Sequence, residues 1–96
     1  MDNLFKKFLD YKLKDIKWGE IKVNFKNSYE KIFKAKEGNL SSNILIKNNS
    51  FFINLLLRGE LGFAESYINN KWETSNLTNL LKILLKNQQI KKKKLG

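Results

Sequence analysis

The sequence predicts an α+β fold, in which a small antiparallel sheet of about three strands has an N-terminal helix and C-terminal helices packed on one face. Three observations support this fold class. Apolar residues recur with a helical period near both ends of the chain, they alternate with polar residues in its first half, and clusters of Gly, Asn and Ser separate the two patterns.

The first predicted element is an amphipathic helix. Over residues 4–16, the apolar side chains fall on one broad side of a helix and most of the charged ones on the other. A basic amphipathic helix suits either a membrane surface or the core of a small domain. Packing on the core is the default interpretation.

Three strands are predicted after this helix. Gly19 breaks the helical period, and Ile21, Val23 and Phe25 then alternate with polar residues, which is typical of a half-buried strand. Residues 29–36 and 44–46 form the second and third predicted strands, with turns at residues 27–28 and 37–39. We therefore expect an antiparallel meander.

From Ser50 onward, the sequence predicts mainly helices. Ser50 is placed to cap a helix that Gly59 ends in a left-handed conformation, and residues 61–68 follow as a short helical piece. Asn76 is placed to cap a last helix with leucines at helical spacing, which should fray near residues 87–89.

The chain is expected to form one domain over residues 1–90, because 96 residues leave no room for a second fold of ordinary size. Residues 91–96 contain four consecutive lysines, whose mutual repulsion predicts a disordered tail.

Composition argues against several functions. The chain has no cysteine and no histidine, so the thiolate nucleophile and the usual metal ligands and proton shuttle are absent. We predict no metal site and no catalytic residue, although whether the chain belongs to an enzyme stays open. No stretch approaches the roughly twenty apolar residues of a membrane span, and the N-terminus lacks a secretory pattern, so we expect a cytoplasmic protein.

Charge is the strongest compositional feature. The formal net charge is +10, from 19 basic and 9 acidic residues, which favours a polyanionic partner, either nucleic acid or an anionic membrane. All of the basic residues except Arg58 are lysines, and this argues against base reading, for which arginine is preferred. Lysines on a solvated face also need no partner. The candidate contacts to anionic lipid are Lys6, Lys7, Lys14 and Lys17.

One extended motif lies in the second half of the chain. Its residues are Gly59, Glu60, Leu61, Gly62, Glu65, Tyr67 and Trp72. In this order the motif resembles the N-terminal domain of cyclopropane-fatty-acyl-phospholipid synthases, which are S-adenosylmethionine-dependent methyltransferases. The resemblance covers about residues 18–87, and the family domain is distantly sterol-carrier-like. Asn70 and Asn76 stand where the family usually has Gly and Asp.

The residues of the motif are expected to have structural roles. Gly59 ends a helix, and Gly62 permits a close approach that a Cβ would block. Tyr67 and Trp72 supply large surfaces to close the core. Glu60 and Glu65 are expected to act as caps or ion-pair partners rather than as an acid/base pair.

The resemblance implies a non-catalytic accessory domain that faces lipid. In the family, a downstream domain carries out methylene transfer from S-adenosylmethionine to phospholipid acyl chains, so no cofactor is expected in this chain. The expected partners are an anionic membrane surface at the inner face of the membrane, a separately encoded catalytic domain, and a second copy of the chain. The lysine run suggests a truncated or split product. A dimerisation scaffold and a small nucleic-acid-binding protein remain as alternatives, the latter the less favoured.

Overall fold

A computed structural model describes residues 13–25, 29–48 and 50–95 of the chain. Most of the predicted first helix, with Lys6 and Lys7, lies outside these residues. Its last turn is described: the Ile16 N–H donates to the Leu13 carbonyl at 3.1 Å, and both side chains pack half-buried against the core. The elements are β1 (Trp18–Phe25), β2 (Tyr29–Lys34), β3 (Glu37–Ile46), α2 (Ser50–Ile68), β4 (Trp72–Glu73) and α3 (Leu77–Leu95).

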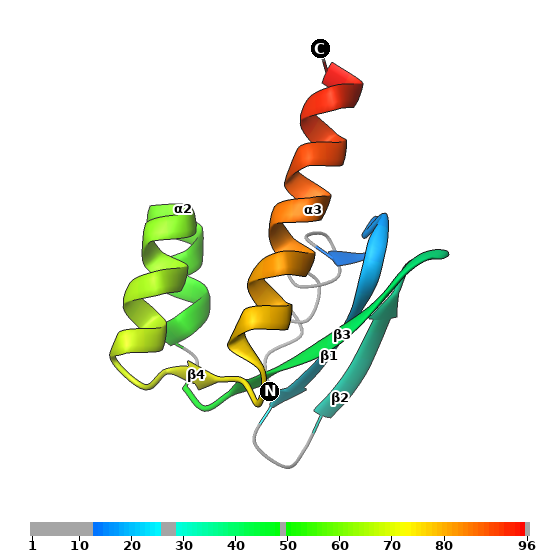
Figure 1. Ribbon diagram of the computed structural model, residues 1–96. Helices are drawn as coiled ribbons and strands as arrows, with labels where there is room; N and C mark the ends of the chain where they lie inside the picture. Colours follow the sequence, from blue (N-terminus) through cyan, green and yellow to red (C-terminus); the bar gives the residue numbers. More distant parts are fainter. Residues whose placement is uncertain (1–12, 26–28, 49, 96) are drawn as a thin grey trace.

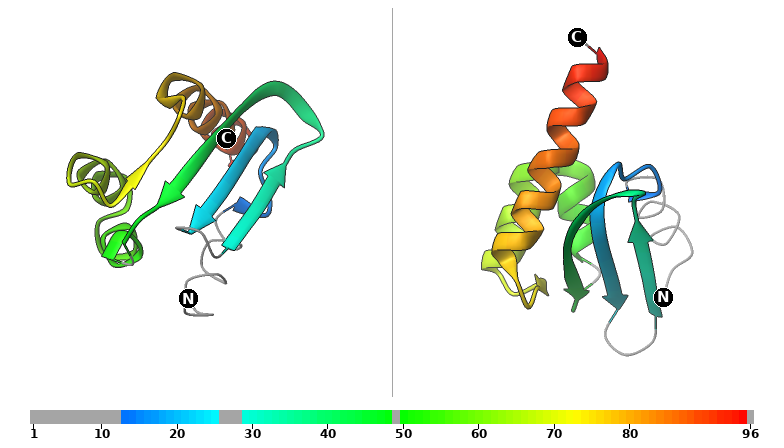
Figure 2. Two further views of the ribbon diagram at one scale, coloured as in Figure 1. Left: turned by 90° about the horizontal axis from the view of Figure 1, so that it is seen from below. Right: turned by 45° about the vertical axis from the view of Figure 1, so that its right-hand side comes forward.

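The two helices α2 and α3 lie side by side on one face of the sheet, which confirms the predicted α+β class (Figures 1 and 2). The alternation in β1 explains this layering, because Ile21, Val23 and Phe25 all point to the helix-covered face and are buried. The core between the layers consists of Ile21, Val23, Phe25, Phe33, Ile44, Ile46, Phe51, Phe52, Trp72, Leu80 and Ile83.

The sheet differs from the predicted antiparallel meander. Four strands lie in the order β2-β1-β3-β4, and β1 pairs antiparallel with β2 but parallel with β3. β4 adds an antiparallel pair at the far side of β3. The sheet is therefore mixed. The antiparallel prediction was wrong because the chain leaving β2 crosses the start of β1 instead of turning back beside β2.

Two glycines make that crossing possible. The Ala35 N–H donates to the Gly19 carbonyl at 3.0 Å, and the chain then passes directly over the start of β1. Gly38 has a φ of 96°, and a Cβ there would lie 2.5 Å from the Gly19 nitrogen and 2.7 Å from the Trp18 ring. The predicted turn at residues 37–39 is thus a close crossing, which shifts the β1–β3 register between Trp18 and Glu20.

β3 is longer than the predicted third strand at residues 44–46, and its polar residues Ser42 and Asn43 hold the loop that enters α3. Asn43 Oδ1 accepts hydrogen bonds from the backbone N–H of Ser75 at 2.9 Å and from its hydroxyl at 2.6 Å. The Ser42 hydroxyl donates to the Asn76 carbonyl at 2.8 Å. These polar side chains replace strand pairing along an edge that β4 is too short to cover.

α2 is a kinked pair of short helices, as predicted. Gly59 breaks the helix with φ 56° and ψ −129°, a conformation open almost only to glycine. The two halves then pack so closely that a Cβ on Gly62 would lie 2.0 Å from the Asn54 carbonyl oxygen. The Asn54 side chain also donates to the buried Ser66 hydroxyl at 3.1 Å. The predicted close approach at Gly62 is confirmed.

The structure confirms one of the two predicted N-cap residues. Asn76 Oδ1 accepts the Asn79 N–H at 3.0 Å and so caps α3, and Asn70 takes the positive φ of 59° that its place in the turn requires. Ser50 does not cap α2. Asn48 does so, because its Oδ1 accepts the Ser50 N–H at 2.9 Å, while the Ser50 hydroxyl is buried and has no hydrogen-bond partner among the described residues.

α3 extends well past the point where fraying was predicted. It runs to Leu95 and projects beyond the sheet and α2 (Figures 1 and 2), although residues 91–96 were predicted to be a disordered tail. Lysine is a good helix former, and positive charge near a helix C-terminus is favoured by the helix dipole. At residues 87–89 the helix is held in place by Asn87, which hydrogen-bonds to the start of β1.

Candidate functional site

Two of the motif residues, Tyr67 and Trp72, form an aromatic cluster with Phe63. Trp72 is only 2% exposed, its ring stacks on Phe63 with centroids 4.4 Å apart, and its Nε1–H donates to the Phe63 carbonyl at 2.9 Å. Tyr67 lies beside the same ring, with centroids 4.9 Å apart. These rings close the end of the core between α2 and the sheet. The aromatic side chains themselves occupy this part of the core.

The two carboxylates of the motif are engaged in local contacts. Glu65 forms an ion pair with Arg58 at 2.8 Å across the α2 kink. Glu60 Oε1 accepts a hydrogen bond of 3.4 Å from the Gln88 side chain and so links α2 to α3. The Glu65 contact is an ion pair, as the sequence predicts, whereas the Glu60 contact is a hydrogen bond from a neutral amide. Among the described residues, no three His, Cys, Asp or Glu side chains lie close enough together to hold a metal ion.

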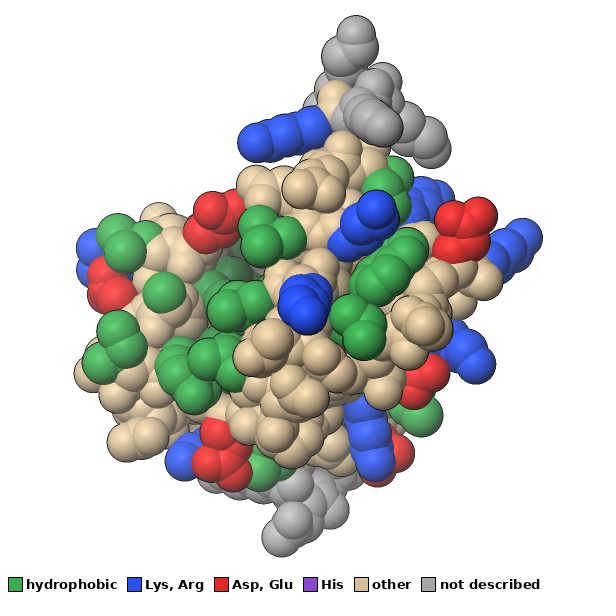
Figure 3. Space-filling model, viewed as in Figure 1, with side chains coloured by type: hydrophobic (Ala, Val, Ile, Leu, Met, Phe, Trp, Pro, Cys, Tyr) green, Lys and Arg blue, Asp and Glu red, His purple; other side chains and the backbone are tan. Residues whose placement is uncertain are grey.

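The clearest unusual feature of the surface is its exposed apolar side chains on α2 and α3. Figure 3 shows hydrophobic side chains on both helices and in the hollow between them. Leu81 and Leu85 of α3 are 45% and 57% exposed. The large exposed apolar residues of α2 are Ile53, Leu56, Leu57, Leu61, Tyr67 and Ile68. No helix in the described ranges is long and apolar enough to cross a membrane.

Lysines lie directly beside the exposed leucines of α3. Leu80 and Ile83 are fully buried against the sheet, while Leu81 and Leu85 form a strip on the outer side. Lys82 and Lys86 each follow one of these leucines, so they lie about 100° further around the helix, next to the strip. We call Leu81, Leu85, Lys82 and Lys86 the α3 face. Its side chains are exposed, and apolar and cationic groups are adjacent on it.

The predicted lipid contacts Lys14 and Lys17 are both exposed. The Lys17 N–H donates to Asn87 Oδ1 at 2.7 Å, which places Lys17 beside the second half of α3. Lys91 lies one helical turn beyond Asn87, so the backbone of Lys17 lies near the part of α3 that carries the later lysines. The structure thereby brings Lys17 close to a segment about seventy positions away in the sequence.

Comparisons with protein-family models, curated proteins and solved structures found no match. The case for a function therefore depends on the geometry of this surface and on the sequence motif.

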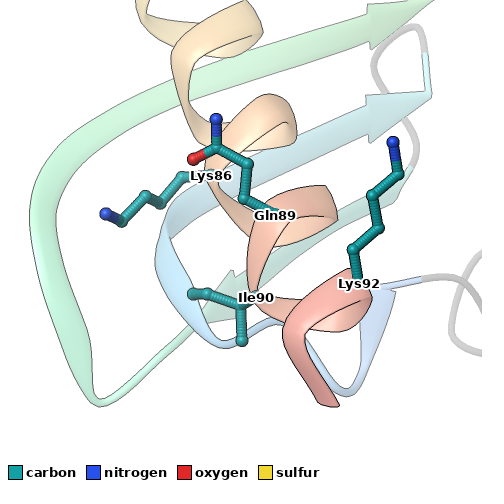
Figure 4. Close-up of a pocket in the computed structure, with 4 residues that line it drawn as sticks. All are labelled: Lys86, Gln89, Ile90 and Lys92. Atoms are coloured by element: carbon teal, nitrogen blue, oxygen red, sulfur yellow. The ribbon is translucent and has the colours of Figure 1, made fainter. Parts of the chain in front are cut away.

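A shallow depression lies along the second half of α3. Lys86, Gln89, Ile90 and Lys92 line it, and all four come from this one helix. In Figure 4 the side chains of Lys86 and Lys92 point away from each other, so they do not converge on a common point. The depression is open and has no enclosed polar centre. We regard it as part of the exposed basic surface of α3.

The α3 face was missed by sequence reasoning, which assigned lipid contacts only to the N-terminal lysines. A signal for it was present. The apolar positions from Leu77 to Leu85 cover about 200° of a helical circumference, which is wider than one face of a helix can bury against a sheet. The surplus leucines had to be exposed, and lysines follow two of them directly.

Proposed function

We propose that this chain is a non-catalytic accessory domain that binds the surface of an anionic phospholipid membrane. The observation that carries this proposal is the α3 face, on which the exposed Leu81 and Leu85 lie beside Lys82 and Lys86. A helix with this arrangement can insert its apolar side chains at the depth of the acyl chains while its lysines contact lipid phosphates.

The electrostatic contribution of the lysines and the apolar contribution of the leucines to membrane binding are both modest, which favours a reversible peripheral contact. Each lysine near an anionic surface contributes up to about 1 kcal/mol, and each buried leucine at most about 2 kcal/mol. The α3 face alone therefore supports weak, salt-sensitive binding, and the neighbouring Lys17, Lys91 and Lys92 strengthen it. Such a domain would act as a peripheral contact at the cytoplasmic face of a membrane.

The sequence motif supports an accessory role in lipid chemistry. Its resemblance to the N-terminal domain of cyclopropane-fatty-acyl-phospholipid synthases points to a partner that modifies phospholipid acyl chains. In this proposal the present chain supplies the membrane contact, and a separate catalytic domain supplies the cofactor and the chemistry. The motif cluster around Trp72 maintains the fold that presents α3.

Vesicle flotation tests the proposal. Lys82→Glu/Lys86→Glu reverses the charge beside the leucine strip, and Lys34→Glu/Lys36→Glu makes the same charge change at exposed sites near the sheet edge. We expect the first variant to lose binding to vesicles with anionic lipid and the second to retain most of it. Neutral vesicles should bind little of either protein. Equal loss in both variants, or tighter and salt-resistant binding to DNA, would contradict the proposal.

A further inference from the structure

The first half of α2 has an apolar outer face that the membrane contact does not explain. Phe51 and Phe52 of this half are buried against the sheet. On the opposite side, Ile53, Leu56 and Leu57 are 51%, 69% and 76% exposed. The helical period places these three residues next to one another, and we call them the α2 face. Three adjacent large aliphatic side chains at this exposure favour an interaction surface.

The charge around the α2 face differs from that of the rest of the protein. There is no lysine between Lys47 and Lys71, although the chain as a whole carries a net charge of +10. The charged residues of α2 are Arg58, Glu60 and Glu65. Arg58 and Glu65 neutralise each other in an ion pair of 2.8 Å, and Glu60 contacts Gln88. The charges of α2 therefore sum to −1, from one arginine and two glutamates, so the helix that carries the α2 face has no excess of positive charge.

These properties distinguish between the possible binding partners of the α2 face. An anionic membrane or nucleic acid would find no cation on the α2 face to contact, in contrast to the α3 face. Two copies of this chain repel each other over most of their surfaces, because both are strongly basic. Across the α2 face that repulsion is smallest, and identical apolar patches can bury each other around a two-fold axis.

We infer that the α2 face is the interface with a second copy of this chain. In the dimer, Leu56 and Leu57 of each copy pack against the same residues of the other, and the Arg58–Glu65 pairs lie at the rim. The lysine-rich ends of α3 belong to a different helix, so they stay available. A dimer would present two α3 faces to one membrane, and linked sites bind more tightly than either site alone. The inference does not depend on the proposed lipid binding.

Light scattering after size-exclusion chromatography, over a series of concentrations, tests the interface. The wild-type chain should show a concentration-dependent dimer. Leu56→Glu/Leu57→Glu should weaken dimerisation at least about a hundredfold, because it places charge on two central apolar anchors. The matched control Leu81→Glu/Leu85→Glu should leave the dimer intact and reduce vesicle binding. Wild-type protein that is monomeric at every concentration, or a dimer that persists in the α2 variant, would overturn the inference.

A cysteine variant gives a test that does not depend on destabilising the surface. The chain has no cysteine, so Leu57→Cys introduces a single thiol. Near a two-fold axis, two such thiols should form a disulfide-linked dimer on mild oxidation. Leu85→Cys, on the α3 face, should remain largely unlinked under the same conditions. Equal cross-linking of the two variants would show that the α2 face is not the interface.

Discussion

Asn87 and Trp18 are joined by two hydrogen bonds that fasten the last helix to the start of the sheet. Asn87 Nδ2 donates to the Trp18 carbonyl at 2.8 Å, and its Oδ1 accepts the Trp18 N–H at 3.1 Å. The same amide also accepts the Lys17 N–H and donates to the Ile83 carbonyl. One side chain of α3 thus satisfies the backbone groups of a residue 69 positions away in the sequence.

Replacement of Asn87 should destabilise the fold. In Asn87→Ala, the half-buried backbone groups of Trp18 lose their partner, and we expect the free energy of unfolding to fall by about 2 kcal/mol. Urea denaturation followed by circular dichroism measures this change. Gln89→Ala, at an exposed position of the same helix, is the control and should change stability by less than about 0.5 kcal/mol. Similar losses in both variants would mean that Asn87 does not hold α3 to β1.

Gly62→Ala should separate the two halves of α2. The added methyl group would clash with the Asn54 backbone, which cannot move as a flexible side chain can. We expect a loss of at least about 2 kcal/mol in the free energy of unfolding. Ala64→Ser, at an exposed position two residues further along the same helix, should have little effect. A Gly62→Ala variant as stable as the wild type would show that the halves are not in close contact.

Trp72→Phe should weaken the core at the end closed by the motif. The substitution removes the hydrogen bond to the Phe63 carbonyl and part of the ring stack, so we expect a loss of about 1–3 kcal/mol in the free energy of unfolding. Fluorescence provides a second readout, because Trp72 is buried and Trp18 is only partly so. In Trp18→Phe the remaining emission should be blue-shifted, as expected for an enclosed indole. Emission typical of a fully hydrated indole would contradict the burial of Trp72.

Deletion of residues 91–96 should weaken lipid binding but leave the stability of the fold nearly unchanged. These residues extend past Asn87, the point at which α3 is anchored, so the thermal unfolding midpoint should change by only a few degrees, about the shift of a sub-kcal/mol effect. Binding to anionic vesicles should fall at least about tenfold, since several lysines each contribute up to about 1 kcal/mol. A large loss of stability would instead assign the end of α3 to the core.

Local patterns predicted most individual elements correctly. The alternation in β1, the break at Gly59, the close approach at Gly62 and the cap at Asn76 each depend on neighbouring residues, and each is confirmed. The path of the chain after β2 was predicted wrongly. A two-residue connection looks the same in sequence whether the next strand pairs with β2 or crosses to the other side of β1, and only the Gly38–Gly19 contact distinguishes the two.

For the α3 face as well, local patterns predict one part and the tertiary structure decides the rest. Its leucines and lysines are evident in the sequence, but which leucines are buried depends on how the sheet and α2 share the circumference of the helix. No local pattern in the sequence connects Lys17 with α3, and Asn87 makes that connection in the folded chain.

By itself, the sequence determined the fold class, the helix and strand periods, the break at Gly59, the cap at Asn76, the strong positive charge and the absence of cysteine and histidine. These follow from residue identity and from neighbours within a few positions along the chain. The tertiary structure decided the parallel pairing of β1 with β3, the joining of Lys17 to the α3 lysines, and which apolar side chains of α2 and α3 stay exposed. Those features depend on contacts between distant segments, which are set by how the layers pack together and not by any local pattern.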